Sequence, residues 1–219
     1  MPKQLSHIIS EAERSRITDA VRSAEGKTAG EIVPCIVEKS DDYEEAIWLV
    51  GLFSALIVLI PYLILHTMSE SWLPWSAGET ILSSLVLSSL TMMGMWFFPG
   101  LRIVVTPRER TERRVAQKAK EVFLAEEVFK TRDRTGILIF VSLLERSVVV
   151  LGDSGINAKV EQSAWEGITG HVTNGMKSGQ PAEGLIRAIH ASGELLQRHG
   201  IARRADDRDE LSDGLRKEA

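Results

Sequence analysis

The chain is organised around an uncharged apolar run, Ala46-Ile-Trp-Leu-Val-Gly-Leu-Phe-Ser-Ala-Leu-Ile-Val-Leu-Ile-Pro-Tyr-Leu-Ile-Leu65. A helix needs about 20 such residues to cross about 30 Å of hydrocarbon, and this run reaches that length. A second uncharged run, Thr80–Phe98, contains serines, threonines and a glycine, which let helices approach closely in lipid. We therefore predict a transmembrane helical hairpin over residues 46–98, with spans at 46–65 and 80–98. The alternative is a buried helical core in a soluble protein.

The distribution of positive charge predicts the orientation of the hairpin. The linker, residues 66–79, contains Glu70 and Glu79 but no Lys or Arg, whereas the segment after the hairpin is rich in both. Positive flanks stay in the cytoplasm, so we predict a bacterial inner (cytoplasmic) membrane protein with both termini cytoplasmic. Five arginines of this flank either form a solvated helix face or contact anionic lipid headgroups, at about 1 kcal/mol per charge: Arg102, Arg108, Arg110, Arg113 and Arg114.

The composition of the chain narrows the classes of molecule that the protein is expected to bind. The chain has 219 residues and a formal net charge of −4, and this mild acidity argues against nucleic acid, whose partners carry a basic face. Outside the hairpin about 165 residues remain, enough for one hydrophobic core. The single Cys35 excludes an internal disulfide and is typical of a reducing compartment. The predicted partners are the lipid bilayer and either a membrane protein complex or further copies of the chain.

The segment before the hairpin predicts one helix and one strand. Ser10-Glu-Ala-Glu13 is a capping-box pattern that opens a helix, and Gly26 is a plausible stop. Residues 32–37 form a short run rich in β-branched side chains, which predicts a strand. Pro34 within it has no N–H for a sheet ladder, which indicates an edge strand or a bulge.

The segment after the hairpin predicts two strands among helices. Thr106-Pro-Arg-Glu109 predicts a helix start, with the helix running to about Lys130. The apolar run 137–144 predicts a central strand, and a tight link to the run 147–151 requires that pair to be antiparallel. Two further helices follow, and the charged tail from residue 203 is predicted to be disordered.

These elements predict an α/β fold in which helices sandwich a small mixed sheet and the transmembrane hairpin interrupts the domain. The first helix and strand must then complete a sheet formed mainly by the segment after the hairpin. The predicted organisation is the first part of the domain at 1–45, the hairpin at 46–98, the remainder of the domain at 99–202 and the tail at 203–219.

Three motifs resemble the TPM domain family. They are Thr28-Ala-Gly-Glu-Ile-Val-Pro34 followed by Ser40-Asp-Asp-Tyr43, the segment Thr135–Ile156 with its Gly-led strand and Arg-containing turn, and Gly175-Met-Lys-Ser-Gly179 with Gly184–Ile189. The resemblance implies an α/β/α sandwich. It further implies a range of activities, because some members resemble acid phosphatases or bind divalent metal and others resemble assembly or repair factors for membrane complexes. The split by a membrane hairpin resembles a bacterial, membrane-anchored subfamily.

Three carboxylates are the candidate metal ligands. Asp153 stands where a strand meets a helix, the usual ligand-facing position of an open α/β sheet, and Asp41 and Asp42 follow the first strand. Together they are predicted to hold a divalent cation, Ca²⁺ or Mg²⁺, through oxygen ligands. The alternative is that Asp153 caps the next helix and that the other two are solvated loop charges. Ser154 resembles a hydrolase nucleophile, but no motif places a histidine base beside it.

Three functions remain open from the sequence. We expect a membrane-anchored, non-catalytic interaction or assembly module at the cytoplasmic face, because no convincing catalytic constellation is present. The alternative is a divalent-metal-dependent phosphatase that uses Asp153, Asp41 and Asp42. A third is a two-span sensor whose outer linker, residues 66–79, reports to the inside.

Overall fold

The computed structural model describes residues 9–68, 75–201, 203 and 210–218. The chain forms two compact units, one from Met1–Asp41 with Glu112–Ala219, and the other from Asp42–Thr111. The second unit is inserted into the first, as the sequence predicts. It is longer than the predicted hairpin because it also contains the residues that flank the two apolar helices.

The first unit is built on a mixed sheet, which in the described part of the chain has the strand order β3-β2-β1-β4. Strand β1 (Glu31–Val37) runs parallel to β2 (Gly136–Ser142), and β2 runs antiparallel to β3 (Ser147–Gly152). Every residue of β1 and of β2 is buried, which is the pattern of strands covered on both faces. The antiparallel pair and the central position of β2 confirm the sequence prediction.

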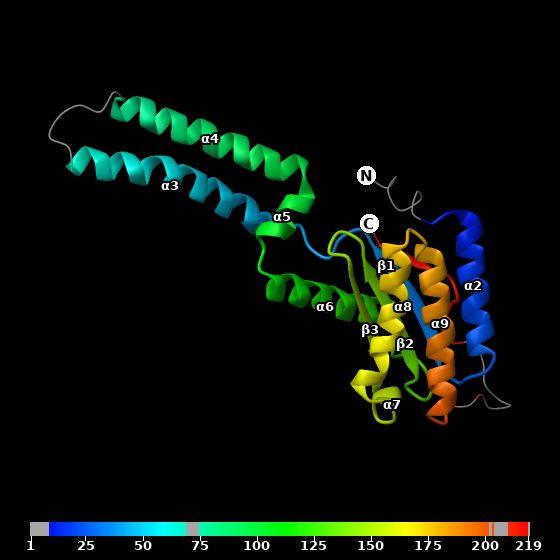
Figure 1. Ribbon diagram of the computed structural model, residues 1–219. Coiled ribbons are helices and arrows are strands. Elements are labelled where there is room, and N and C mark those ends of the chain that lie inside the picture. Colours follow the sequence, from blue (N-terminus) through cyan, green and yellow to red (C-terminus); the bar gives the residue numbers. More distant parts are fainter. Residues whose placement is uncertain (1–8, 69–74, 202, 204–209, 219) are drawn as a thin grey trace. The chain divides into compact units, whose positions relative to one another are not determined.

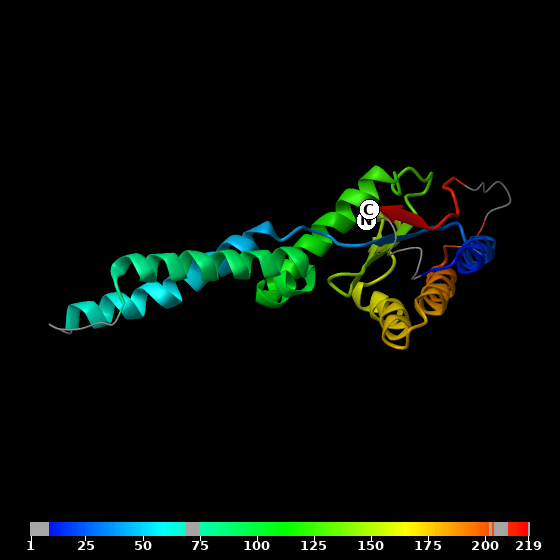
Figure 2. The same ribbon diagram turned by 90° about the horizontal axis from the view of Figure 1, so that it is seen from above.

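Helices cover both faces of this sheet (Figures 1 and 2). Helices α2 (Glu11–Glu25), α8 (Glu166–Lys177) and α9 (Pro181–Arg198) lie on one face, where side chains such as Ile32, Ile137 and Leu196 share one core. Helix α6 (Arg108–Ala125) packs Val115, Ala119 and Val122 against the other face. Two short elements, α7 (Ser154–Asn157) and η1 (Gln162–Trp165), connect β3 to α8. The predicted α/β/α sandwich is confirmed.

The helix ends that the sequence predicts are confirmed in part. Helix α2 has the predicted capping box, in which Ser10 and Glu13 bond reciprocally, and Gly26 is its C-cap. Helix α6 ends at Ala125, several residues before the predicted Lys130. Glu127 has a φ of 54°, which turns the chain so that the fully buried Val128 enters the core. Burial of one apolar side chain therefore ends the helix early.

Strand β1 pairs with a second neighbouring strand only after its proline, Pro34. Strand β4 (Arg216–Glu218) pairs with β1 in parallel, but only at Cys35, Ile36 and Val37. β1 is therefore internal to the sheet over these residues, and the predicted edge strand is wrong there. At Pro34 no β4 residue is paired, so the missing N–H of the proline costs no ladder hydrogen bond on that side.

The end of the chain also differs from its prediction. The sequence predicts a disordered tail over 203–219, yet Arg216–Glu218 is strand β4. Two ion pairs hold this segment to the first unit, Arg22–Asp213 at 2.5 Å and Arg216–Glu126 at 2.6 Å. The two ion pairs, together with the three residues of β4 that pair with β1, give this segment an ordered structure. Its composition alone favours disorder. Residues 204–209 of the predicted tail lie outside the described residues.

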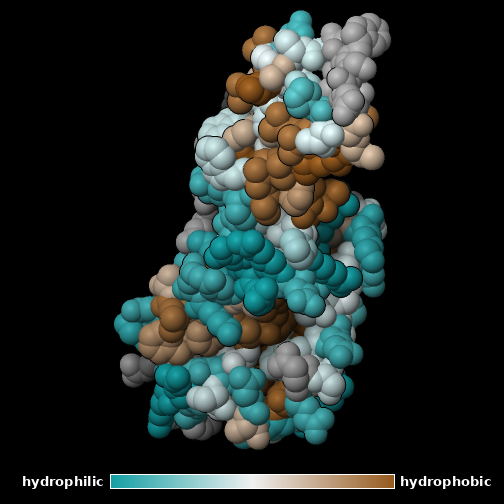
Figure 3. Space-filling model, turned by 90° about the vertical axis from the view of Figure 1, so that its left-hand side faces the viewer, coloured by the Kyte–Doolittle hydropathy of each residue, from teal (hydrophilic) through white to brown (hydrophobic). Residues whose placement is uncertain are grey.

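The second unit is a pair of long apolar helices, α3 (Glu44–Met68) and α4 (Ala77–Phe97), followed by the short α5 (Pro99–Val105). Both long helices have the length and composition to cross a membrane, and only 17% of the apolar window of each is buried. Large apolar side chains instead face outward, and they gather in the upper part of Figure 3. The linker residues 69–74 lie outside the described residues.

Polar groups join the two long helices to each other. Ser54 Oγ lies 2.9 Å from Thr91 Oγ1, and Ser88 donates a hydrogen bond to the carbonyl of Gly51. At Gly51 an added Cβ would lie 2.7 Å from the sulfur of Met92, so side chains of α4 pack directly against the backbone of α3 at this glycine. Small and hydroxylated residues therefore form the α3–α4 contact, as the sequence predicts for helices in lipid.

Candidate functional site

Asp153 is an N-cap, which confirms the alternative interpretation of this residue. Its Oδ1 accepts a hydrogen bond from the backbone N–H of Ser154 at 2.6 Å, and its Oδ2 lies 2.9 Å from Nε of Arg134. The side chain is buried, so the ion pair with Arg134 offsets part of the cost of burying the charge. Both carboxylate oxygens thus have protein partners, and Ser154 is the first residue of α7.

The sheet holds Asp153 and Asp41 at opposite ends. The backbone N–H of Asp153 bonds the carbonyl of Gly136, where β2 begins, whereas Asp41 follows Val37, which pairs with Ser142 at the end of β2. Seven residues of strand at about 3.3 Å each separate these ends by roughly 20 Å. The structure therefore does not bring the two carboxylates together around one ion.

Asp41 and Asp42 have other partners. Asp41 Oδ2 lies 2.7 Å from Nε of Arg114, and the backbone carbonyl of Asp42 accepts a hydrogen bond from Arg102. Within the described ranges, the structure contains no group of three or more His, Cys, Asp or Glu side chains arranged to hold a metal ion. The three predicted ligands do not fit Ca²⁺ or Mg²⁺ as one site.

A polar cluster that sequence reasoning missed lies where β1 and β2 end. Glu145, in the turn between β2 and β3, accepts hydrogen bonds from the backbone N–H of Ser40 at 2.9 Å and from the hydroxyl of Ser142. Ser40 Oγ in turn donates to Ser142 Oγ at 2.9 Å. These bonds fix the turn rigidly against the exit of β1. The sequence signal was the Glu-Arg pair between the two apolar strands, which predicted only a tight turn.

Beside this cluster the first unit has a cavity of about 540 Å³, whose walls include Leu143, Val148 and Met176. Two basic side chains, Arg146 and Lys177, stand at its rim, and both are exposed. Neither has a hydrogen-bond or ion-pair partner among the residues that the structure describes. The carboxyl ends of parallel strands are where α/β sheets bind ligands. This edge is therefore the candidate functional site of the domain, apolar inside and positive outside.

Several of the arginines predicted to contact lipid headgroups have partners within the protein. Arg102 donates to backbone carbonyls of the second unit, and Arg110 Nη2 lies 2.7 Å from Oε1 of Glu45. Arg114 is paired with Asp41. Arg108 and Arg113 are exposed residues of α6. Arg102, Arg110 and Arg114 therefore have structural roles, and the contact of the basic flank with lipid stays a prediction.

The fold is that of a small α/β/α domain interrupted by an apolar helical pair. Residues 100–195 match the model of the TPM domain family, which confirms the resemblance seen in the sequence. This part of the chain is therefore similar to TPM domains.

One solved structure supports the same fold. The NMR structure of the BA42 protein from the psychrophilic bacterium Bizionia argentinensis sp. nov. is similar with a TM-score of 0.58 and 20% sequence identity, over 96% of this chain and 95% of that chain. At this identity the likeness shows the fold alone. No curated protein matches the chain.

Proposed function

We propose that the chain is an integral protein of the bacterial inner membrane, anchored by α3 and α4, whose TPM domain acts as an interaction or assembly module at the cytoplasmic face. The observation that carries the anchoring is the exposure of large apolar side chains around both helices. Trp48 and Ile57 on α3 are 68% and 70% exposed, and Leu82 on α4 is 63% exposed. Contiguous apolar surface of this extent marks a membrane or protein contact.

The proposed orientation is supported by the charges at the base of the hairpin. Both ends of the second unit connect to the first unit, so a single membrane face accommodates the whole TPM domain. The base carries Arg102, Arg108 and Arg110, whereas the linker contains acidic residues and no Lys or Arg. Positive flanks are retained in the cytoplasm, which favours the domain on that side.

The interaction role is supported by the cavity at the carboxyl edge of the sheet. Both oxygens of Glu145 accept hydrogen bonds that hold the turn, so this carboxylate serves the structure of the turn. The groups at the rim that have no partner in the described part are the cations Arg146 and Lys177. An apolar hollow with a basic rim suits docking of an acidic segment with an apolar side chain, from a membrane partner or a second copy.

Fractionation of the full-length chain tests the anchoring. We expect it to sediment with membranes, to resist alkaline carbonate and to need detergent for release. Tags at both termini are expected to be digested by protease only when the cytoplasmic face is accessible. Release by carbonate, or tags that report opposite compartments, would falsify the proposal.

An assay of the same detergent-solubilised protein separates the module from the phosphatase alternative. We expect no turnover of a small phosphoester above a buffer control, with or without Mg²⁺ or Ca²⁺. Asp153→Asn, which retains a good N-cap residue, provides the matched variant. Metal-dependent turnover that Asp153→Asn abolishes is the result that favours the phosphatase.

A further inference from the structure

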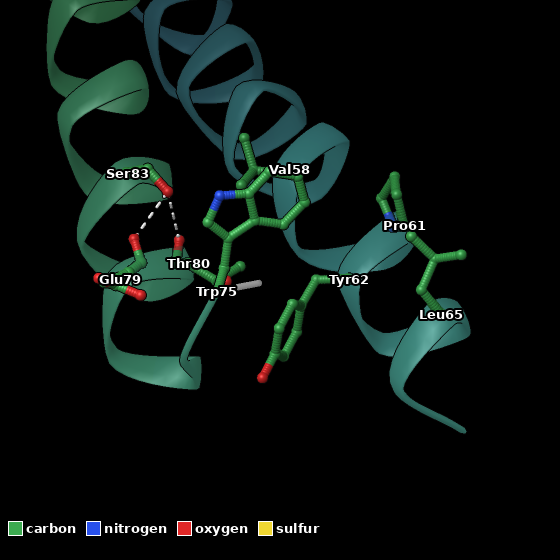
Figure 4. A pocket seen from close by; sticks show the side chains of 8 residues that line it. All are labelled: Val58, Pro61, Tyr62, Leu65, Trp75, Glu79, Thr80 and Ser83. Atoms are coloured by element: carbon green, nitrogen blue, oxygen red, sulfur yellow. Dashed lines mark hydrogen bonds between the residues drawn. The ribbon is translucent and has the colours of Figure 1, made fainter. Parts of the chain in front are cut away.

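The loop end of the hairpin contains a cavity of about 460 Å³ between α3 and α4 (Figure 4). Pro61, Tyr62 and Leu65 line it from α3, and Trp75, Glu79 and Ser83 line it from the start of α4. In Figure 4 the indole of Trp75 stands between the two helices, with the ring of Tyr62 beside it. The cavity is thus lined by two aromatic rings, and none of the described residues that line it is Lys or Arg.

The carboxylate of Glu79 is held in place through one of its two oxygens. Its Oε2 accepts hydrogen bonds from the backbone N–H of Ser76 at 2.8 Å and from Ser76 Oγ at 3.0 Å, which forms the capping box of α4. Its Oε1 has no hydrogen-bond partner among the described residues. Tyr62 is also oriented, because its ring stacks on that of His66 with a centroid separation of 5.7 Å. An oriented carboxylate and one oriented ring therefore belong to the lining of this cavity.

The chemistry of these three groups selects an ammonium ion. The faces of indole and phenol rings attract cations through their quadrupoles, and a carboxylate adds an opposite charge. A primary ammonium has three N–H donors, so it suits a cavity whose lining includes a carboxylate and two aromatic rings. A quaternary ammonium has no N–H to donate, and an anionic group is repelled by Glu79.

A second, apolar groove begins at the same residues. A hollow of about 410 Å³ along α4 is lined by Leu82, Val86, Leu87 and Leu90, and it shares Glu79 and Ser83 with the first cavity. From Glu79 to Leu90 the helix rises by about 16 Å at 1.5 Å per residue. The cavity therefore continues into a shallow aliphatic groove along α4, which is long enough for much of an acyl chain.

We infer that the hairpin binds an aminophospholipid, with its primary ammonium in the cavity of Trp75, Tyr62 and Glu79 and an acyl chain along α4. The inference rests on the proposed membrane location, in which the loop end lies at the outer interface and α4 descends from it into the hydrocarbon. In that setting the cavity lies at the depth of the lipid headgroups, and the groove runs from it into the hydrocarbon. A phospholipid has the same arrangement, with its headgroup at the interface and its acyl chains below.

The experiment is native mass spectrometry of the full-length chain released from nanodiscs of equal parts phosphatidylethanolamine, phosphatidylcholine and phosphatidylglycerol. We expect the wild type to retain phosphatidylethanolamine at least about fivefold over either of the other two lipids. Glu79→Gln removes the charge but keeps a residue that forms a capping box, and it is expected to abolish this preference. Tyr62→Leu is expected to reduce it, and Trp48→Leu, an exposed aromatic on α3 at the far end, is the matched control that leaves it unchanged.

Equal retention of the three lipids, or the same preference in Glu79→Gln as in the wild type, overturns the inference. Failure of the chain to enter nanodiscs at all counts instead against the proposed membrane location, so the two proposals fail by different observations. Phosphatidylcholine retained as strongly as phosphatidylethanolamine also overturns the inference, because it removes the requirement for an N–H donor.

Discussion

The guanidinium of Arg102 donates a hydrogen bond to the backbone carbonyl oxygen of Asp42 at 2.8 Å, and so joins the two ends of the inserted unit. The same side chain bonds the carbonyls of Met95 at 2.9 Å and Trp96 at 3.2 Å, in the last turn of α4. Carbonyls at a helix C-terminus have no intrahelical donor, so Arg102 satisfies them while it closes the base of the hairpin.

Replacement of Arg102 by Ala is therefore expected to loosen the base of the hairpin. Hydrogen bonds to a charged donor contribute about 1.5–3 kcal/mol each, discounted here because the side chain is only half-buried. We expect a loss of about 1–2 kcal/mol, measured as faster amide hydrogen exchange at the last turn of α4 in detergent. Arg102→Lys is expected to recover only part of it, because an ammonium lacks the fork geometry of guanidinium.

The control for this measurement is Lys120→Ala, an exposed basic residue of α6. It removes the same charge and should leave exchange in α4 at the wild-type rate. Equal effects of the two variants would show that net charge, and not the three carbonyl contacts, is what Arg102 provides.

The contact between Ser54 and Thr91 predicts a measurable coupling between α3 and α4. Their hydroxyl oxygens lie 2.9 Å apart, and such pairs in membrane helices average about 0.6 kcal/mol in double-mutant cycles. We expect Ser54→Ala and Thr91→Ala to show a coupling of that size when unfolding is followed in mixed micelles. Ser89→Ala removes a hydroxyl whose partner among the described residues is the carbonyl of Leu85 in its own helix, and it should show no coupling with Ser54→Ala.

The sequence predicts the fold well where the signals are local. The capping box of α2, the apolar runs of β2 and β3 and the two uncharged runs within α3 and α4 each depend on residues close together in the chain. The pairing of β1 with β2 joins residues about a hundred positions apart across the insertion, and no local pattern specifies it. The ordered structure of the segment with β4 depends similarly on the ion pair between Asp213 and Arg22. The composition of the tail does not reveal this contact.

The structure does not bring the predicted metal ligands together, and the reason is again a non-local one. Asp153 was placed at a ligand-facing edge because it follows a strand, but β3 runs antiparallel to β2. Its carboxyl end therefore lies where β1 and β2 begin, and Asp41 lies where they end. The short link between β2 and β3 predicted the antiparallel pair correctly, whereas the direction of β1 relative to them came only from the structure. The edge with Glu145, Arg146 and Lys177 then takes the place of the predicted site.

Acid conditions are expected to weaken the start of α2. The pKa of Glu13 is lowered, first because the backbone N–H of Ser10 bonds its carboxylate and then because the Ser10 hydroxyl does. A carboxyl with a lowered folded-state pKa adds stability above its unfolded pKa, about 4.3, and loses it as the pH falls through the folded value. Glu13→Gln keeps an acceptor but does not titrate. We expect exchange at α2 amides to differ between the two proteins above about pH 5 and to converge as the pH falls below about 4.

Two glycines of the first unit are expected to respond in opposite directions to the same substitution. A Cβ added at Gly136 would lie 2.0 Å from the carbonyl oxygen of Val128, whereas one added at Gly170, in α8, meets nothing within 4 Å. Backbone cannot move away as a flexible side chain does, so Gly136→Ala is expected to cost about 3 kcal/mol or more. Gly170→Ala is expected to stabilise α8 by up to about 1 kcal/mol, because alanine has the higher helix propensity. Thermal unfolding of the full chain in detergent measures both, and destabilisation of similar size at the two positions would contradict the packing of β2 against Val128.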